Sequence, residues 1–443
     1  MDLSTTLLVP FSLVGALALE PSSPTPASDW STWRGPTADG VAGPDARPPL
    51  TWSEDDNVRW KVEIDGLGNS TPLVLGERIY LTTAIDLGEG KSELGEVDVL
   101  GPQPGPPGLA NHHAFVVLAL DTKTGDEDWR RVVVTEVPRL KQHKTGSHAS
   151  PSIVTDGTTL VANFGTSGLY GMTLDGEVKW TRRLGDKTVA ADFGEGSTAA
   201  VQGKTMILQW DQEGPSFVAA FAIDTGEELW RKERKFDSSW GSPAIATVDG
   251  RAQVILNGTD ITVGHDVETG EEIWRCGGMS KNPTTSPLVR DGVLFVMNSY
   301  RGDVTQAIRL EGAKGELDGT DAVLWTRQRG ASYVPTPVAH DGLLYNLRDS
   351  NGLLNCLDAA TGEPVYTAQR LGDLRDIHAS PIVADGRIYI SSREGRTVVV
   401  REGSEFEILA ENALDDVFDA TPVFVGDAIL LRGRAHLYCI GEK

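Results

Sequence analysis

The stretch SPIVADGRIYI, residues 380–390, decides the fold because it is one copy of a block that recurs along the chain. The block consists of Ser or Thr, Pro, an apolar pair, Asp-Gly or a similar turn, and an apolar run. The clear copies begin at Thr71, Ser150, Ser242, Ser286, Thr336, Ser380 and Thr421, and a degenerate copy lies at Ser197-Thr198. Apart from a long first gap, the period is about 41–50 residues, which is the spacing of propeller blades. Eight copies therefore predict eight blades.

A second block follows most copies and reads Asp, a short spacer, Thr-Gly, an acidic residue and then an aromatic residue. This order is typical of a hairpin, because Asp caps the turn through its side chain and Gly supplies the positive φ. The aromatic residue then lies on the next strand, from which we expect it to pack between neighbouring sheets. The structural docking residues predicted in this way are Asp121, Gly125, Trp129, Trp180, Trp230 and Trp274.

The two ends of the repeat region complement each other. Residues 421–440 supply only three strands, whereas residues 58–64 form a strand with no blade before it. Pairing these two segments removes both exposed edges. We therefore predict an all-β fold, an eight-bladed β-propeller of four-stranded blades whose ring is closed by the N-terminal strand completing the last blade. The 49 Gly and 24 Pro residues suit the many turns of such a fold, and no long stretch has a helical period.

The chain outside the repeats divides into a leader and an extension. Residues 1–27 contain the apolar run Leu7–Leu19 with a small-x-small cleavage site, which predicts a signal peptide or exported leader. Asp2 and the lack of Lys or Arg before this run leave a misplaced start codon or an uncleaved anchor open. Residues 28–57 are an N-terminal extension, and residues 58–443 are the propeller, with a first-blade insertion at 86–113.

Composition limits the partners and the location of the protein. A formal net charge of −23 argues against nucleic acid or anionic membrane as the main partner, because phosphates require a basic face. The predicted leader indicates an exported protein, periplasmic or associated with the cell envelope, with no integral membrane domain in its mature chain. Because no Cys lies near residue 20, we expect that it is not a lipoprotein. Cys276, Cys356 and Cys439 fall in different blades and have no metal or redox spacing.

Two motifs carry a family resemblance. The string ALDTKTGDEDW, residues 119–129, resembles the tryptophan-docking motif of the pyrroloquinoline quinone (PQQ)-like β-propeller repeat family. The opening WSTWRGP, residues 30–36, followed by Asp39-Gly40, is similar to the start of PQQ-like repeat proteins of planctomycete-type bacteria. The resemblance covers nearly the whole mature chain, and it implies the eight-bladed propeller of the quinoprotein alcohol dehydrogenase-like superfamily.

This superfamily implies two different kinds of function. In its dehydrogenases, PQQ lies at the channel mouth between a tryptophan and a disulfide of adjacent cysteines, beside calcium and a catalytic aspartate. The present sequence has no adjacent cysteines and no Cys-x-x-Cys-His segment. The chain also resembles the periplasmic propeller subunit of the outer-membrane barrel-assembly machinery, which is a scaffold without a cofactor.

The repeat register predicts a ring of candidate ligand-binding residues. The residue three before each motif Pro varies from blade to blade, and at the start of the innermost strand it would surround one mouth of the channel. The predicted ring comprises Asn69, His148, Glu195, Trp240, Thr284, Val334, His378 and Asp419. Trp240 could stack on a planar ligand, and the metal candidates are His148, Glu195, His378 and Asp419. A polar mouth that holds only water is the alternative.

The function that we predict is an exported, non-catalytic propeller that acts as a protein-binding or scaffold module of the cell envelope. We predict no catalytic residues and no cofactor, and we expect a monomer whose partners are proteins or envelope components. The alternative is a PQQ- or metal-dependent oxidoreductase with its site at the channel mouth, in which PQQ would bind with calcium. Nucleic acid is not an expected partner.

Overall fold

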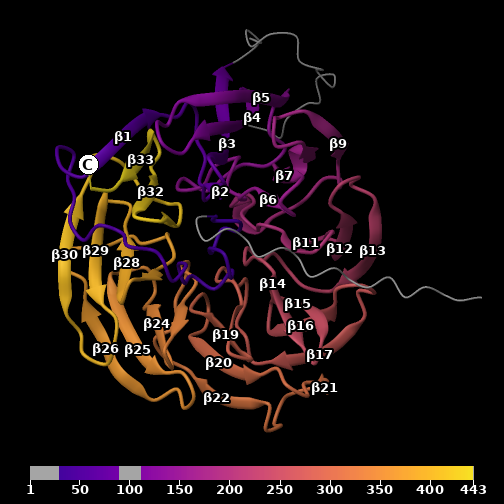
Figure 1. Ribbon diagram of the computed structural model, residues 1–443. Coiled ribbons are helices and arrows are strands. Elements are labelled where there is room, and N and C mark those ends of the chain that lie inside the picture. Colours follow the sequence, from indigo (N-terminus) through magenta and orange to yellow (C-terminus); the bar gives the residue numbers. More distant parts are fainter. Residues whose placement is uncertain (1–28, 89–110, 443) are drawn as a thin grey trace, which may run out of the picture.

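The computed structural model describes residues 29–88 and 111–442. Eight sheets follow one another in chain order around a central axis (Figure 1), each with four antiparallel strands, and the fourth sheet gains a short fifth strand that runs parallel to its neighbour. The predicted eight-bladed all-β propeller is therefore confirmed. The only helical segments among the described residues are two short 3-10 turns, η1 (Gly165–Ser167) and η2 (Ala190–Asp192).

The blades are numbered in chain order, and in blades 1 to 7 the strands run from the channel outward. Blade 1 comprises β2 (Leu73–Leu75), β3 (Arg78–Gly88), β4 (His112–Asp121) and β5 (Glu127–Glu136). Blade 2 comprises β6 (Val154–Thr155), β7 (Leu160–Asn163), β8 (Leu169–Met172) and β9 (Val178–Arg182). Blade 3 comprises β10 (Ala200–Gln202), β11 (Thr205–Trp210), β12 (Ser216–Ala222) and β13 (Glu228–Arg234). Blade 4 comprises β14 (Ala244–Val248), β15 (Arg251–Gly258), β16 (Ile261–Asp266), β17 (Glu272–Gly277) and β21 (Gly315–Glu316).

The second half of the ring repeats this arrangement. Blade 5 comprises β18 (Leu288–Arg290), β19 (Val293–Asn298), β20 (Val304–Arg309) and β22 (Val323–Arg327). Blade 6 comprises β23 (Val338–His340), β24 (Leu343–Leu347), β25 (Leu353–Asp358) and β26 (Pro364–Arg370). Blade 7 comprises β27 (Ile382–Ala384), β28 (Arg387–Ser391), β29 (Arg396–Arg401) and β30 (Ile408–Ala413). Blade 8 comprises β31 (Val423–Val425), β32 (Ala428–Arg432), β33 (His436–Ile440) and, as its outermost strand, β1 (Val58–Glu63).

The ring closes as the sequence predicts. Strand β1 pairs antiparallel with β33, and Val62 lies opposite Leu437. Apolar side chains from neighbouring blades fill the spaces between the sheets; one such cluster joins Leu73 and Tyr80 of blade 1 to Leu160 and Met172 of blade 2. This packing makes the blades one continuous body.

A chain of hydrogen bonds links the innermost strands from blade to blade. In each of the first seven blades, the N–H of a Ser or Thr just before the innermost strand donates to the hydroxyl of the equivalent residue in the next blade, at 2.9–3.3 Å. In order, these residues are Thr71, Ser152, Thr198, Ser242, Ser286, Thr336, Ser380 and Thr421. The hydroxyl of the recurring block thus joins the blades, because it satisfies a buried backbone donor of its neighbour.

These bonds correct the register predicted for two blades. The first residue of the innermost strand follows Pro directly in blade 7, where Ile382 pairs with Tyr389. In blade 2 the equivalent pair is Val154–Val161, and in blade 3 it is Ala200–Ile207. Ile153 and Ala199 therefore occupy the Pro position, rather than Pro151 and Thr198. The shared requirement is the hydroxyl, so the Pro that guided the sequence alignment is dispensable.

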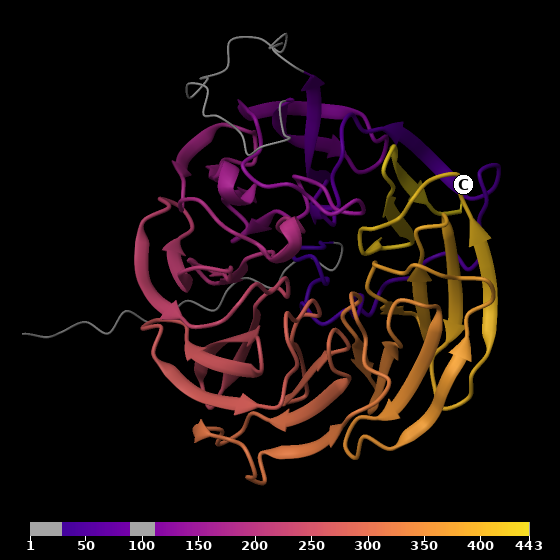
Figure 2. The ribbon, with the colours of Figure 1, turned by 180° about the vertical axis from the view of Figure 1, so that it is seen from behind.

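The N-terminal extension belongs to the ring rather than lying beside it. Figures 1 and 2 show its indigo ribbon crossing the centre of the ring. Trp30 forms a β-bridge with Val74 of blade 1, and Val41 forms one with Val383 of blade 7. Both contacts involve the central residue of an innermost strand, so the segment lines the channel.

Arg34 anchors this segment in the channel. Its guanidinium donates to the carbonyl oxygens of Pro381 (3.0 Å), Pro337 (2.6 Å) and Asp39 (3.1 Å), and the residue is only 1% exposed. Burial lowers the pKa of Arg34 to about 10, a cost that the nearby charge of Asp39 partly offsets. One side chain thus joins the extension to blades 6 and 7.

Two predicted segments fall wholly or largely outside the described residues. The predicted leader, residues 1–27, lies outside them, and so do residues 89–110 of the first-blade insertion. The two ends of that insertion belong to β3 and β4. Within the part of the chain that the structure describes, no helix has the length and hydrophobicity of a membrane span.

Candidate functional site

Two long loops come together over the open mouth of the channel. Residues 137–153 and 183–199 lead into the innermost strands of blades 2 and 3, and they are longer than the six equivalent connections. They contact each other directly, since the His143 N–H donates to the Phe193 carbonyl (3.2 Å) and Lys141 pairs with Asp192 (3.3 Å). The mouth therefore has an asymmetric cover on the side of these two blades.

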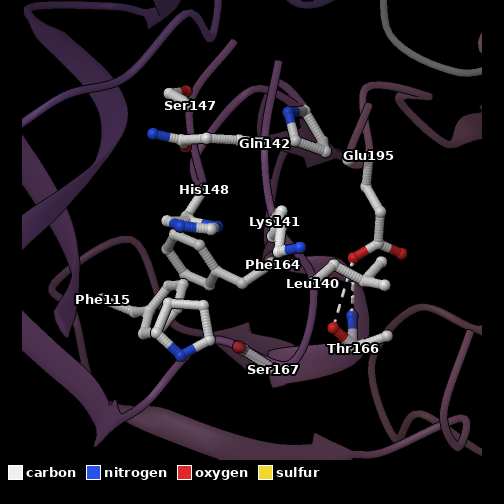
Figure 3. A pocket seen from close by; sticks show the side chains of 14 residues that line it. Phe115, Leu140, Lys141, Gln142, Ser147, His148, Phe164, Thr166, Ser167 and Glu195 are labelled. Atoms are coloured by element: carbon white, nitrogen blue, oxygen red, sulfur yellow. Dashed lines mark hydrogen bonds between the residues drawn. The ribbon is translucent and has the colours of Figure 1, made fainter. Parts of the chain in front are cut away.

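A small cavity lies beneath these loops (Figure 3). Its lining includes His148 and Glu195, with Phe115, Phe164 and Thr166 from blades 1 and 2. Its volume of about 20 Å³ admits about one water molecule. Ligand pockets usually measure about 300–1,000 Å³, so this cavity does not fit a group the size of PQQ.

Glu195 is already engaged by protein donors. Its Oε2 accepts a hydrogen bond from the Thr166 N–H (2.9 Å), and its Oε1 lies 3.6 Å from the Lys187 ammonium. A Cβ on Gly165 would stand 1.8 Å from Oε2, so the carboxylate could not keep this position beside a larger residue. Lys187 also lies over the Trp210 ring, 4.6 Å from its centroid. Glu195 therefore ties blade 2 to blade 3.

His148 lies among aromatic rings. It packs edge-on against His113, with the ring centroids 5.0 Å apart, and it also contacts Phe115. Burial, helped by the nearby His113, lowers the pKa of His148 to about 4. The imidazole is therefore uncharged at neutral pH.

His378 and Asp419 are direct neighbours at the mouth. The His378 Nδ1 lies 3.2 Å from Asp419 Oδ1, which also accepts from Arg393 Nε (2.6 Å), while Oδ2 accepts from Arg434 Nε (3.2 Å). Burial raises the pKa of Asp419, but the hydrogen bond from His378 and the charges of His378, Arg393 and Arg434 outweigh it, so the pKa is lower than usual. Asp419 could therefore bind a metal ion only by giving up some of these donors.

The four metal candidates are not brought together as one set. Glu195 and His148 lie on the side of blades 2 and 3, whereas His378 and Asp419 belong to blades 7 and 8. Among the described residues, the one group of three side chains with convergent ligand atoms is His340, Asp341 and Glu402, near the turn after β23. His340 and Glu402 there hydrogen-bond to each other.

Trp240 stands in an aromatic cluster at the mouth. Its Nε1 donates to the Gly194 carbonyl (2.9 Å), and its ring packs against Phe193 at a centroid distance of 6.2 Å. His143 packs edge-on against the same Phe193, at 5.1 Å. Phe193 is nevertheless 39% exposed. Sequence reasoning missed this residue because it lies in a loop without a counterpart in the other blades.

The remaining residues of the predicted ring make fewer polar contacts. Asn69 donates from Nδ2 to the Thr145 carbonyl (2.9 Å), which ties it to the first long loop. Thr284 and Val334 are half-buried. In the register that the strand pairing defines, Ser150 and Gly196 are the equivalents in blades 2 and 3. His148 therefore lies two residues before the ring position of blade 2, and Glu195 lies one residue before that of blade 3.

The docking tryptophans join successive blades at the strand ends that lie away from the channel mouth. Trp129, Trp180 and Trp230 donate from Nε1 to the carbonyls of Leu174, Ile223 and Val267 in the next blade, at 2.9–3.2 Å. Asp121 accepts the N–H groups of Lys123 and Thr124, and a Cβ on Gly125 would lie 2.7 Å from the Trp60 ring. Trp274 differs, because it donates to Gln253 within its own blade.

Trp60 and Trp325 dock in the same way but are absent from the sequence prediction. They donate to the carbonyls of Thr122 and Ala359. Trp60 lies in the closing strand, before the first copy of the turn block, and Trp325 follows an enlarged turn that contains β21. A tryptophan on the strand just before the next copy of the first block recurs along the chain, and this pattern could have identified Trp60.

The comparisons with known proteins agree with this geometry. Residues 42–211 and 215–442 match the PQQ_2 family model, described as outer membrane protein assembly factor BamB. The structure of BamB from Moraxella catarrhalis has 11% sequence identity and a TM-score of 0.57, and the match covers 86% of this chain and 99% of that chain. A search of curated proteins finds no match.

Quinohemoprotein alcohol dehydrogenases have the same fold. The enzyme from Comamonas testosteroni has 11% identity and a TM-score of 0.60, over 94% of this chain and 81% of that chain. The enzyme ADHIIG from Pseudomonas putida HK5 has 12% identity and a TM-score of 0.60, over 94% and 80%. Such low identities establish the fold alone, whereas the family match spans nearly all described residues. The chain therefore belongs to the PQQ_2 propeller family, the family described as outer membrane protein assembly factor BamB.

Proposed function

We propose that this protein is a cofactor-free scaffold of the cell envelope that binds another protein at the open mouth of its channel. The observation that carries the proposal is the exposed Phe193, which rests on Trp240 and His143 at the mouth. A partly exposed aromatic ring with a rigid support is the kind of residue that dominates the binding energy of protein interfaces.

The polar groups around the mouth support the same proposal. Asp419 is held by His378, Arg393 and Arg434, and Glu195 by Thr166 and Lys187. Because these carboxylates already have charged or N–H partners, they act as rigid supports for the loops rather than as groups that wait for a ligand. A rigid surface loses little entropy when a partner binds.

The family suggests the kind of partner. Its description names an outer membrane protein assembly factor, so the partner that we propose is a protein component of outer-membrane assembly. An exported or periplasmic location is part of this proposal. The monomeric state is likewise proposed, with the partner bound to the face that carries loops 137–153 and 183–199.

Site-specific crosslinking tests this function. A photoreactive residue replaces Phe193, and a matched control replaces Leu229, which is 49% exposed on the outer strand β13. In the cells that produce the protein, we expect one discrete adduct from position 193 with a component of outer-membrane assembly, and none from position 229. Identical adducts from both positions, or none from position 193, would contradict the proposal.

A second candidate is a PQQ- or metal-dependent oxidoreductase with its site at the mouth. The half-buried Trp240 favours it, because an indole at the mouth could stack on a planar cofactor. Phe193 already packs against this ring, and the nearby cavity of about 20 Å³ is too small for PQQ. Cys276, Cys356 and Cys439 are buried free thiols.

Calorimetric titration with PQQ, with and without calcium, separates the two candidates. Saturable binding near one PQQ per chain that is lost in Trp240→Ala, together with reduction of an artificial electron acceptor by simple alcohols, would establish the oxidoreductase. Such a result would also overturn the cofactor-free scaffold. Without heat or dye reduction, the scaffold remains the function that the mouth supports.

A further inference from the structure

The place where the ring closes contains a second cavity. It lies between blade 8 and blade 1 and has a volume of about 330 Å³, within the range of about 300–1,000 Å³ for ligand pockets. We call it the seam cavity, and its lining consists of Arg59, Thr122, Lys123, Val425, Ala428, Leu430 and Cys439. It belongs to neither the channel mouth nor the N-terminal segment.

The next seam around the ring shows which side chains fill the equivalent space there. Strand pairing makes Tyr80 of blade 1 equivalent to Leu430 of blade 8, and Arg78 equivalent to Ala428. The Tyr80 hydroxyl and Arg78 Nη1 both donate to the Leu174 carbonyl of blade 2, each at 3.3 Å. Blade 8 therefore lacks two large side chains at positions where blade 1 has a phenol and a guanidinium.

The same residue string occurs in blade 7, where it contacts the N-terminal extension. Arg387 and Tyr389 occupy the equivalent positions, and they donate to the carbonyls of Pro48 (3.2 Å) and Pro49 (3.3 Å). Blades 1 and 7 thus both use an Arg-Ile-Tyr string to contact a neighbouring backbone, which is that of blade 2 in the first case and that of the N-terminal extension in the second. The Ala-Ile-Leu string at residues 428–430 leaves that volume open.

The charges around the space are also reversed. In the seam between blades 1 and 2, Arg78 lies between Asp128 (3.0 Å) and Asp175 (2.7 Å). The residue before the docking tryptophan is Asp128 in that seam and Arg59 in the closing seam, before Trp129 and Trp60 respectively. The carbonyl that accepts the hydrogen bond of the indole N–H is followed by Asp175 in the seam between blades 1 and 2, and by Lys123 in the closing seam.

We propose that the seam cavity binds a small aromatic carboxylate that carries a phenolic hydroxyl. Its ring takes the volume that Tyr80 fills in the neighbouring seam, and its hydroxyl donates to the Thr122 carbonyl, the equivalent of Leu174. Its carboxylate lies between Arg59 and Lys123, where the charge pattern calls for an anion in place of the guanidinium. Since Arg78 and Tyr80 reach one carbonyl, the two polar groups of the ligand lie close together, as in 3-hydroxybenzoate.

The cations can exchange their present partners for this ligand. Arg59 pairs with Asp427 (2.7 Å) and Lys123 pairs with Glu77, and the two carboxylate side chains are 65% and 73% exposed. Ion pairs at such exposed positions contribute little to stability. A ligand carboxylate partly removed from water makes stronger charge-assisted hydrogen bonds.

Calorimetric titration of the full chain with 3-hydroxybenzoate at low salt tests the proposal. We expect one site per chain, at least tenfold weaker binding of 3-methylphenol, which lacks the charge, and weaker binding of benzoate, which lacks the hydroxyl. Leu430→Tyr, which places a phenol in the cavity, is expected to abolish binding while leaving the protein folded. No binding of millimolar 3-hydroxybenzoate, or equal binding by Leu430→Tyr, would overturn the proposal.

Charge variants test the anion specificity. Lys123→Glu is expected to weaken binding about tenfold, whereas Lys235→Glu, at an exposed lysine that follows β13 of blade 3, is expected to leave it unchanged. The double variant Arg78→Ala/Tyr80→Leu opens the same space between Asp128 and Asp175. It is expected to bind 3-hydroxybenzylamine, which is a cation, at a new site. Equal affinity of Lys123→Glu and wild type for 3-hydroxybenzoate would contradict the proposed role of the cations, even if the double variant fails to fold.

Discussion

Trp180 of blade 2 covers Gly226 of blade 3 so closely that a Cβ at position 226 would lie 2.5 Å from the indole ring. Gly226→Ala is therefore expected to lower the free energy of unfolding by about 2–4 kcal/mol, from the cost of a positive φ and from overpacking. Gly203→Ala is the matched control, because Gly203 has a positive φ of 57° and open space around it. It is expected to cost about 1 kcal/mol. Urea unfolding of both variants checks this, and equal losses would contradict the docking role.

The hydroxyl chain between innermost strands makes a separate prediction. The Thr336 Oγ1 accepts the buried Ser286 N–H at 3.0 Å. Thr336→Val preserves the shape but leaves that N–H without its partner, so the unfolding free energy is expected to fall by about 1–3 kcal/mol. Thr336→Ser keeps the hydroxyl and is expected to lose less. The two variants are compared by denaturant titration, and the reverse order would argue against the hydrogen bond as the cause.

The Arg34 guanidinium is predicted to stabilise the N-terminal segment in the channel. Arg34→Met leaves the carbonyls of Pro337, Pro381 and Asp39 without this donor, and we expect a loss of about 3 kcal/mol. Arg47→Met is the control, since the Arg47 side chain is 61% exposed. Its effect should stay within about 0.5 kcal/mol. Thermal unfolding and proteolysis of the segment report both effects.

Acid is expected to destabilise the protein well before its carboxylates titrate. Burial lowers the pKa of His148 and of His265 to about 4, whereas an unfolded histidine titrates near 6.5. Between pH 6.5 and pH 4 these histidines are protonated in the unfolded chain but not in the folded chain. Their contribution to the unfolding free energy is therefore fully present above pH 6.5 and falls toward pH 4. Each histidine accounts for roughly 2–3 kcal/mol at the lower limit. His265→Gln should flatten the measured profile of stability against pH, and an unchanged slope would contradict this assignment.

The repeats made the fold predictable, because self-similarity reports blade number and the incomplete last copy reports ring closure. The register of blades 2 and 3 was wrong because Pro was taken as the fixed point, whereas the structure requires the hydroxyls of Ser152 and Thr198. The partners of His148 and Glu195 come from loops with no internal copy to compare. The contacts of Arg34 likewise could not be predicted, since they join segments about 300 residues apart or more.

The pairing of β1 with β33 also bears on how the protein is made. Strand β1 is made before every other strand of the ring, yet its partner β33 (His436–Ile440) is made after all the others. Bringing such distant segments together is slow. Until they meet, a growing chain exposes unpaired strand edges, which favour aggregation. The ring therefore cannot close until β33 has been made, and until then blade 8 lacks the strand that lies between β32 and β1.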